Sequence, residues 1–314
     1  MLRYITRRIL YAIPILVGVS LLTFVLFYMS ATPEQMARRN LSAKNPTPTQ
    51  IHQWVVQRGY DKPRPVQFAK HMSELFLLKF GKTDSIQQED IWDRIKRGAP
   101  VSFQIASLIF LGSIVCSVSF ALGAAYFRGT YIDLSITLIC VFMLSVVYML
   151  YIITGQFLLG KLLRLFPLAG YREGLISWKF VWIPMLVGIA NSIPGSTRYY
   201  RTFMLDEMNL DYVRTARAKG VSEAKILFHH VLKNAAVPIL TTVVAAIPSL
   251  FLGSILVESF FSIPGLGGFL KDAILGQDFA VVRAMTFLGT ILTIIGYLLT
   301  DISYGFVDPR VRLE

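Results

Sequence analysis

The sequence predicts an all-α membrane protein with six membrane-spanning helices. First, 54% of its 314 residues are hydrophobic and only 16% are charged, whereas soluble domains carry about 25% charged residues. Second, the apolar residues form six runs without Asp, Glu, Lys or Arg, and a lipid core about 30 Å thick needs roughly 20 helical residues. Five runs are near or above that length, and the last reaches it when extended to Phe306. The runs cover residues 9–31, 101–127, 134–159, 180–197, 235–257 and 284–299.

The first run follows Arg3, Arg7 and Arg8, as the apolar part of a secretory signal would. It is longer than the roughly 7–15 apolar residues of a signal, and no typical cleavage site follows Ser30. We therefore expect residues 1–31 to form the first membrane helix and to stay attached.

The next segment, residues 32–98, mixes polar residues and five prolines with aromatic residues such as Trp54 and Trp92. Frequent aromatic residues indicate a small folded cap of short helices rather than a flexible linker. Residues 99–306 would then form a core of five further helices, and residues 307–314 a tail.

The distribution of basic residues predicts the orientation. With the amino terminus in the cytoplasm, 13 Lys and Arg lie in the inner segments and 6 in the short outer loops, as the positive-inside rule requires. Both termini are then cytoplasmic, and the cap, with 12 more, is extracytoplasmic. Because much of the net charge of +12 lies on exported segments, it predicts membrane lipid and no nucleic acid as a partner.

The sequence contains no common catalytic or metal-binding motif. His229 and His230 are adjacent, so on a helix they diverge by about 100° and cannot bind one metal as an i, i+4 pair would. Residues 155–161 resemble a phosphate-binding loop, but Leu162 follows where Mg²⁺ binding requires Ser or Thr. We therefore predict a non-catalytic chain with no metal or other cofactor of its own.

The predicted spans also lack the ionisable groups that ion-driven carriers keep at mid-membrane. Any uphill transport must therefore draw its energy from another subunit. The deepest polar side chains are amides and hydroxyls, which either form hydrogen bonds between helices or line a solute path. These are Gln104, Gln156, Asn191 and Ser192.

The inner loop, residues 198–234, predicts two short helices around a glycine. Asn209 or Asp211 would cap the first helix, and Gly220 would follow its end as C′. Ser222 would cap the second, residues 223–233, which leads into Pro238 at the start of the next span. Alone, such a basic knob would be a solvated surface; its small residues Ala216 and Ala218 would also allow a partner to approach closely.

Residues 211–220, DYVRTARAKG, and the following VLKNAAVP resemble the coupling loop of ABC-importer permeases, in the dipeptide and oligopeptide branch. Arg7-Arg8 and residues 301–310 resemble the two ends of that branch, and residues 258–267 its outer loop. The outer-loop motif comprises Glu258, Phe261, Pro264, Gly265 and Gly267.

This resemblance implies a six-span permease of the type I ABC importer kind in the bacterial inner membrane. Its implied partners are a second homologous permease, two cytoplasmic subunits that bind ATP and Mg²⁺, and an extracytoplasmic solute-binding protein. Peptides would be the solute; nickel chelates, glutathione, opines and peptide antibiotics remain alternatives, as does a passive channel or scaffold. The implied ATPase-coupling residues are Tyr212, Arg214, Thr215, Ala216, Arg217, Ala218, Lys219, Gly220 and Glu223.

The sequence departs from the branch in the third span, where Ser-x-Pro-x-Phe is usual and Ser145-Val-Val147-Tyr-Met149 stands. Ala31-Thr-Pro33-Glu likewise replaces the usual Pro-Gly-Asp-Pro after the first span. Without a proline at Val147, we expect the third span to lack its kink.

Overall fold

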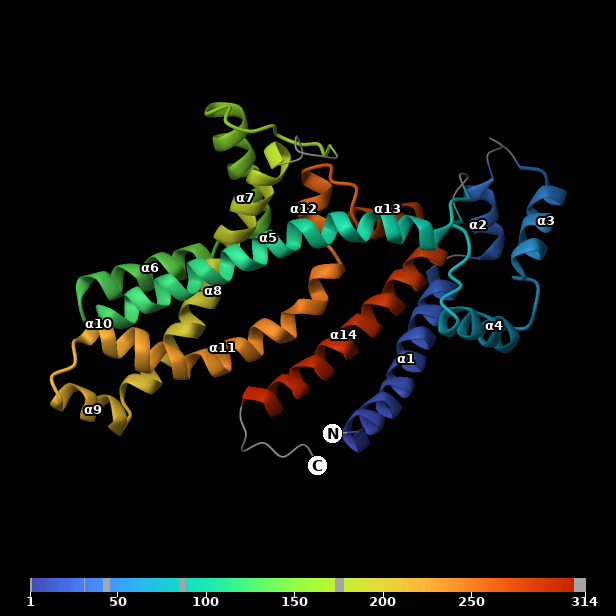
Figure 1. Cartoon of the computed structure of the whole chain (residues 1–314). Helices are drawn as coiled ribbons and strands as arrows, with labels where there is room; N and C mark the ends of the chain where they lie inside the picture. The colour runs from blue at the N-terminus through green and yellow to red at the C-terminus, as the bar shows by residue number, and fades with distance from the viewer. Residues whose placement is uncertain (1, 31, 42–45, 85–87, 173–177, 308–314) are drawn as a thin grey trace.

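The computed structural model describes residues 2–30, 32–41, 46–84, 88–172 and 178–307. Within these ranges the chain is helical, apart from loops and one antiparallel bridge between Lys82 and Asp90. The longest helices are α1 (Leu2–Ser30), α5 (Ile91–Tyr126), α8 (Trp178–Met208) and α14 (Phe279–Val307). α5 crosses α8, and α1 lies beside α14 (Figure 1).

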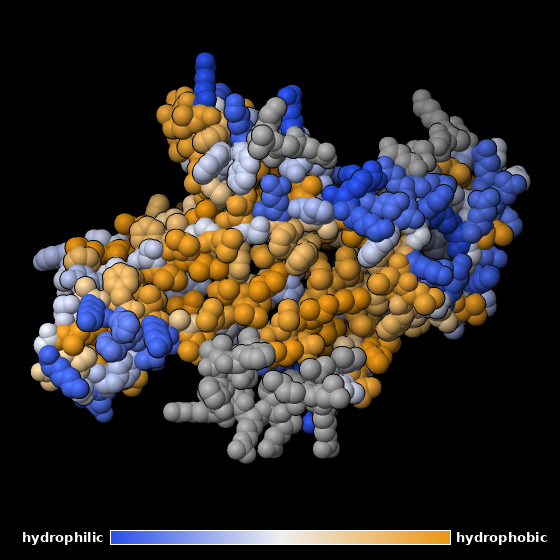
Figure 2. Space-filling model, viewed as in Figure 1, coloured by the Kyte–Doolittle hydropathy of each residue, from blue (hydrophilic) through white to orange (hydrophobic). Residues whose placement is uncertain are grey.

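Four described helical segments are long and apolar enough to cross a membrane: Thr6–Met29, Ile91–Tyr126, Glu223–Phe251 and Phe279–Ile302. A fifth results if the bent pair Tyr131–Leu144 and Tyr148–Leu162 is one span. The remaining predicted run, 180–197, lies in α8, which has 31 residues but a polar carboxyl-terminal half. Figure 2 shows an apolar belt across the middle of the molecule, between hydrophilic surfaces at its two ends. The structure therefore supports an all-α membrane protein with four or five candidate spans.

Close approach of backbones holds the centre of the bundle together. Gly112 on α5 faces Ile189 of α8, and Gly188 on α8 faces Ile109 of α5, where a Cβ atom would collide with either isoleucine. Small residues at helix crossings are typical of membrane bundles, because packing replaces the hydrophobic effect there. At the edge of the bundle, the Arg8 guanidinium of α1 lies 2.7 Å from the Asp301 carboxylate of α14.

The helical pair that covers the predicted third run is sharply bent, so the expectation that Val147 leaves this run without a kink is wrong. α6 (Tyr131–Leu144) and the helical segment that starts with α7 (Tyr148–Gly155) meet at 96°. Val147 is extended, and the Tyr151 hydroxyl donates to the Met143 carbonyl at 2.7 Å. The Ser145 hydroxyl donates to the Val141 carbonyl at 3.1 Å. Hydroxyl groups thus satisfy carbonyls at the bend, and no proline is needed.

The inner loop also differs from the prediction. α8 continues to Met208, and α9 (Asp211–Ala218) begins after Leu210, so neither Asn209 nor Asp211 is its N-cap. The second helix does not stop at residue 233. It runs from α10 (Glu223–Lys225) through the π-helix η3 (Ile226–Val231) and α11 (Leu232–Ala246) to the 3₁₀-helix η4 (Ile247–Phe251). Pro238 lies inside this helix, which membrane helices tolerate. The fifth span therefore begins earlier and ends earlier than predicted.

Segment 32–98 contains three short helices: α2 (Pro33–Asn40), α3 (Pro48–Arg58) and α4 (Arg64–Phe76). Thr32 and Thr47 cap α2 and α3 in capping boxes with Gln35 and Gln50. Residues 91–98, predicted as part of the cap, belong instead to α5. The cap packs around a hydrophobic core in which Phe27 of α1 joins Met36, Ile51, Trp54 and Tyr60.

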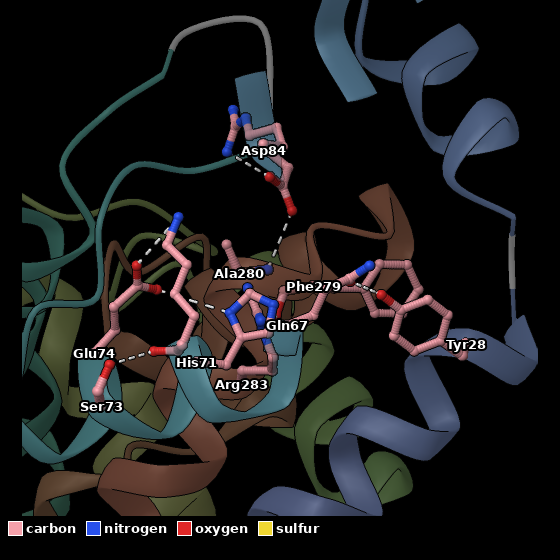
Figure 3. Close-up of polar contacts among 11 residues, drawn as sticks. Tyr28, Gln67, His71, Ser73, Glu74, Asp84, Phe279, Ala280 and Arg283 are labelled. Atoms are coloured by element: carbon pink, nitrogen blue, oxygen red, sulfur yellow. Dashed lines mark hydrogen bonds and ion pairs between the residues drawn. The ribbon is translucent and has the colours of Figure 1, made fainter. Parts of the chain in front are cut away.

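Polar side chains hold the cap to α1 and α14 (Figure 3). The Asp84 carboxylate, 4% exposed, lies 2.6 Å from the Arg58 guanidinium and accepts from the Ala280 N–H at 3.2 Å. The Tyr28 hydroxyl of α1 donates to Gln67 of α4. Burial and the nearby Arg283 lower the pKa of His71 to about 3, so this imidazole is neutral. The cap and the start of α14 therefore form one packed unit.

We predict that Arg58→Ala destabilises the cap by about 3 kcal/mol, because it leaves the Asp84 carboxylate buried without its partner. Burial and Asp278 already raise the pKa of Asp84, and loss of Arg58 raises it further. A carboxyl with a raised folded pKa stabilises the fold below its unfolded pKa, and that contribution is lost as pH rises through the folded value. The loss should therefore be larger at pH 8 than at pH 5.

Thermal unfolding in detergent at both pH values measures this effect. Arg38→Ala, on the exposed surface of α2, is the matched control and should change little. An equal loss for Arg58→Ala at the two pH values would contradict the role given to Asp84.

Candidate functional site

α9 is a short helix whose inner face is fixed by apolar packing. Val213 is fully buried and Ala216 is 9% exposed, in one cluster with Met204 of α8 and with η3. Ala216 therefore packs within the chain rather than on the face that a partner would meet. The exposed face carries Arg214, Thr215, Arg217, Ala218 and Lys219.

Gly220 ends α9 in a Schellman motif, which confirms the predicted C′ position. Its φ is +75°, in the left-handed region that favours glycine. The Gly220 N–H donates to the Arg217 carbonyl at 2.9 Å, and the Val221 N–H donates to the Ala216 carbonyl at 3.2 Å. A Cβ atom at Gly220 would have no neighbour within 4 Å. Backbone conformation, not space, therefore restricts this position.

Two side-chain contacts join the knob, residues 211–220, to its neighbouring helices. The Tyr212 hydroxyl donates to the Glu207 carboxylate of α8 at 2.6 Å, and burial together with Glu207 raises the pKa of Tyr212. The Arg217 guanidinium makes two bonds to the Glu223 carboxylate, at 2.6 and 3.1 Å, across the Gly220 turn. Arg217 and Glu223 thus neutralise each other, and the Arg214 guanidinium, 71% exposed, lies 3.4 Å from the Asp211 carboxylate. Lys219 is exposed at the end of α9 and extends the basic surface outward.

A further ion pair, which the sequence analysis missed, connects α8 to the α5–α6 corner. The Arg201 guanidinium makes two bonds to the Asp133 carboxylate of α6, at 2.9 and 2.8 Å. The Gly129 N–H also donates to Asp133 at 3.2 Å, and Arg128 donates to Asn209 at 3.1 Å. The only indication of this ion pair in the sequence is Asp133, an acid that directly precedes the apolar run 134–159. These bonds tie the α5–α6 corner to the end of α8 that precedes the knob.

The four candidate path residues are not equivalent. The Gln156 amide donates to the Leu168 and Phe260 carbonyls at 3.1 and 3.0 Å, and Gln104 accepts from the Tyr171 hydroxyl at 3.4 Å. Both amides therefore hold the fold together. Ser192 lines a cavity of about 230 Å³, whereas Asn191, its neighbour on α8, does not. The other polar residues that line the cavity, all missed in the sequence, are Ser102, Ser113, Tyr148, Ser249 and Ser254; Glu258 lines it too.

The outer-loop motif is built around the Glu258 carboxyl, which is 3% exposed. It accepts from the Ser102 hydroxyl of α5 at 2.7 Å, and from the N–H groups of Ser254 at 3.3 Å and Gly268 at 2.8 Å. Burial raises the pKa of Glu258, and these hydrogen bonds oppose the rise.

The glycines of the motif form a cradle for this carboxyl. A Cβ atom at Gly265 would collide with Glu258 and Ser102, and one at Gly267 would collide with the Ser254 backbone. Phe261 is buried and Pro264 is exposed. The motif therefore closes α12 (Ile255–Phe260) and α13 (Leu266–Gly276) onto α5.

Among the described residues, no three His, Cys, Asp or Glu side chains are grouped so that they could hold a metal ion.

Comparison with known proteins covers nearly the whole chain. Residues 109–313 match the family model of the binding-protein-dependent transport system inner membrane component, and residues 1–105 match its N-terminal counterpart. An oligopeptide transport system permease protein of Bacillus subtilis is 31% identical over 99% of this chain and 100% of its own length. A putative peptide transport system permease protein of Brucella abortus is 33% identical over 99% of both chains.

A dipeptide transport system permease protein of Lactococcus lactis is 31% identical over 100% of both chains. These matches, along the whole length of an apolar helical bundle, place the chain in the family of inner membrane components of binding-protein-dependent transport systems.

Proposed function

We propose that this chain is a permease subunit of an ATP-driven ABC importer for peptides. It would form half of the translocation path, together with a second homologous permease. Two cytoplasmic subunits would bind and hydrolyse ATP with Mg²⁺, and an extracytoplasmic binding protein would deliver the solute. The observation that carries this proposal is the knob: an exposed basic helix, fixed by side-chain contacts to two long helices of the bundle.

In this proposal the chain crosses the membrane six times, with α6 and α7 as one bent span and α8 as the fourth. Figure 1 supports this topology, because the start of α1, the end of α14 and α9 lie toward one side of the molecule, and the cap, α12 and α13 toward the other. The first side would be cytoplasmic, in agreement with the distribution of Lys and Arg. The cap would then lie outside the cell membrane, near the binding protein.

The knob can transmit force because it cannot move alone. Tyr212 connects it to α8 through Glu207, and Arg217 connects it to the α10–α11 helix through Glu223. A partner that moves α9 therefore moves both spans as a rigid body. Seated in an ATPase cleft, α9 would convert closure of the ATPases into rotation of the helices around the path. The docking face would comprise Tyr212, Arg214, Thr215, Ala218 and Lys219, with Ala216 supporting it from inside and Arg217 bracing it through Glu223.

Peptide as the solute is supported by the three relatives described above, which are named as oligopeptide, peptide and dipeptide transport permeases. Reconstitution with the partner ATPases and binding protein tests the whole proposal. Peptide-loaded binding protein should raise ATP turnover and drive peptide into the vesicles. If ATP turnover rises with a nickel chelate, glutathione or an opine, but with no peptide, the assignment of peptide as the solute is wrong. Solute flux through the chain without the ATPases would overturn the importer.

Gly220→Val should uncouple ATP hydrolysis from uptake without preventing assembly. A β-branched residue at φ +75° costs more than the roughly 1–2 kcal/mol of an ordinary L-residue in the left-handed region, so the turn between α9 and α10 should distort. We expect uptake in reconstituted vesicles to fall at least tenfold, while basal ATP turnover persists. Gly123→Val on α5, where a Cβ atom also meets nothing within 4 Å but φ is helical, is the control. Full uptake by Gly220→Val would contradict the role of the turn.

Arg217 and Glu223 offer a charge-swap test of the internal brace. Arg217→Glu places two carboxylates together and should reduce uptake several-fold, because the pair is partly exposed and screened. The double variant Arg217→Glu with Glu223→Arg restores an opposite-charge pair and should recover most of the uptake. Failure of the double variant would mean that Arg217 acts by contacting the ATPase directly and not as a brace.

A further inference from the structure

The cavity that Ser192 lines is bordered mainly by hydroxyl groups and apolar side chains. It has a volume of about 230 Å³ and lies among α5, α7, α8, η4 and the start of α12. Its apolar lining includes Ile105, Ile109, Phe110, Leu250 and Val257, and no Lys or Arg lines it. Polar recognition in this cavity therefore rests on its hydroxyl groups and on the Glu258 carboxyl.

Three of the serines, on three different helices, donate their hydroxyl protons to backbone carbonyls of their own helix. The Ser113 hydroxyl donates to the Phe110 carbonyl at 2.8 Å, Ser192 to the Gly188 carbonyl at 2.9 Å, and Ser249 to the Ala246 carbonyl at 2.6 Å. A hydroxyl has one proton and two lone pairs. Each of these three oxygens therefore offers a solute in the cavity lone pairs only.

At the end of the cavity near α12, the Glu258 carboxyl is a further hydrogen-bond acceptor. The Ser102 hydroxyl donates to the Glu258 carboxyl at 2.7 Å, and that carboxyl accepts two further backbone N–H bonds. The Ser254 oxygen accepts from the Val257 N–H at 3.4 Å, so Ser254 and Tyr148 can still donate their hydroxyl protons. Acceptors nevertheless outnumber these two donors in the lining, and a buried acid lies at one end. A group with several N–H donors therefore finds more partners here than a carboxylate does.

We propose that this cavity binds a protonated primary amine of the solute, whose three N–H donors suit three acceptor oxygens from α5, α8 and η4. The inference deepens the proposed function and rests on it: for a peptide, the group is the N-terminal ammonium, and the cavity is a station on its path. Specificity follows from hydrogen-bond polarity, since the aliphatic walls do not distinguish side chains.

Thiol protection tests the site without a binding protein and without uptake. The complex of both permeases and ATPases is placed in nanodiscs, with Cys116→Ala, Cys140→Ala and Ser249→Cys in this chain. A neutral thiol reagent then labels Cys at position 249. Alanine amide, which carries an ammonium, should slow labelling several-fold, whereas propionamide, which lacks it, should not. Ser119→Cys, at a serine with the same back-bond to a helix carbonyl but outside the cavity, is the control. Equal protection by the two amides, or none, would overturn the proposal.

Uptake gives the second measurement. Trialanine and its desamino analogue are compared at saturating loaded binding protein, so that the affinity of the binding protein does not enter. The triple variant Ser113→Ala, Ser192→Ala and Ser249→Ala should lower trialanine uptake by about tenfold and leave the analogue unchanged, because hydrogen bonds to a charged donor are the stronger ones. Equal losses for both solutes would indicate a structural role and overturn the proposal. No uptake of either solute by the unmodified chain would count against the proposed function, and the protection test would still decide the site.

Discussion

The structure depends on one constraint: in a lipid core, each backbone N–H and C=O must find its partner within the protein. A continuous helix satisfies this constraint through its own hydrogen bonds. Where a helix breaks, the backbone groups need other partners. At the bend after α6, the Tyr151 and Ser145 hydroxyls satisfy carbonyls of the preceding turn. After η4, the Glu258 carboxyl accepts the N–H groups of Ser254 and Gly268. Both breaks are therefore fixed structures and not flexible joints.

The same bonds divide the bundle into units that must move together. Glu258 binds Ser102, so α12 and α13 follow the amino-terminal half of α5. Asp133 binds Arg201, so α6 follows the carboxyl-terminal half of α8. Tyr212 and Arg217 likewise join α9 to α8 and α10.

Features set by local sequence could be predicted, and those set by distant partners could not. Long uncharged runs predicted α1, α5, α11 and α14, and the position of Gly220 after a basic turn predicted its left-handed conformation. The bend at Val147 could not be predicted, because it depends on a hydroxyl at Tyr151 reaching back to Met143 rather than on a proline. The Asp133–Arg201 pair joins residues 68 positions apart, and nothing near either residue indicates the other. From the sequence, Ala216 was predicted to allow close approach of a partner, but in the structure it packs against α8 and η3.

The serines of the cavity connect the lipid constraint with selectivity. A serine in a membrane helix is tolerated because its proton can return to a carbonyl three or four residues earlier, as at Ser113 and Ser192. That bond fixes the direction of the proton, and so it turns a hydroxyl that could both donate and accept into an acceptor alone. Three such oxygens around one space make its polarity definite without a charge at mid-membrane, where a charge is costly. A transport path can therefore prefer one end of a solute and still release it, because hydrogen bonds to hydroxyls are weaker than an ion pair in the same place.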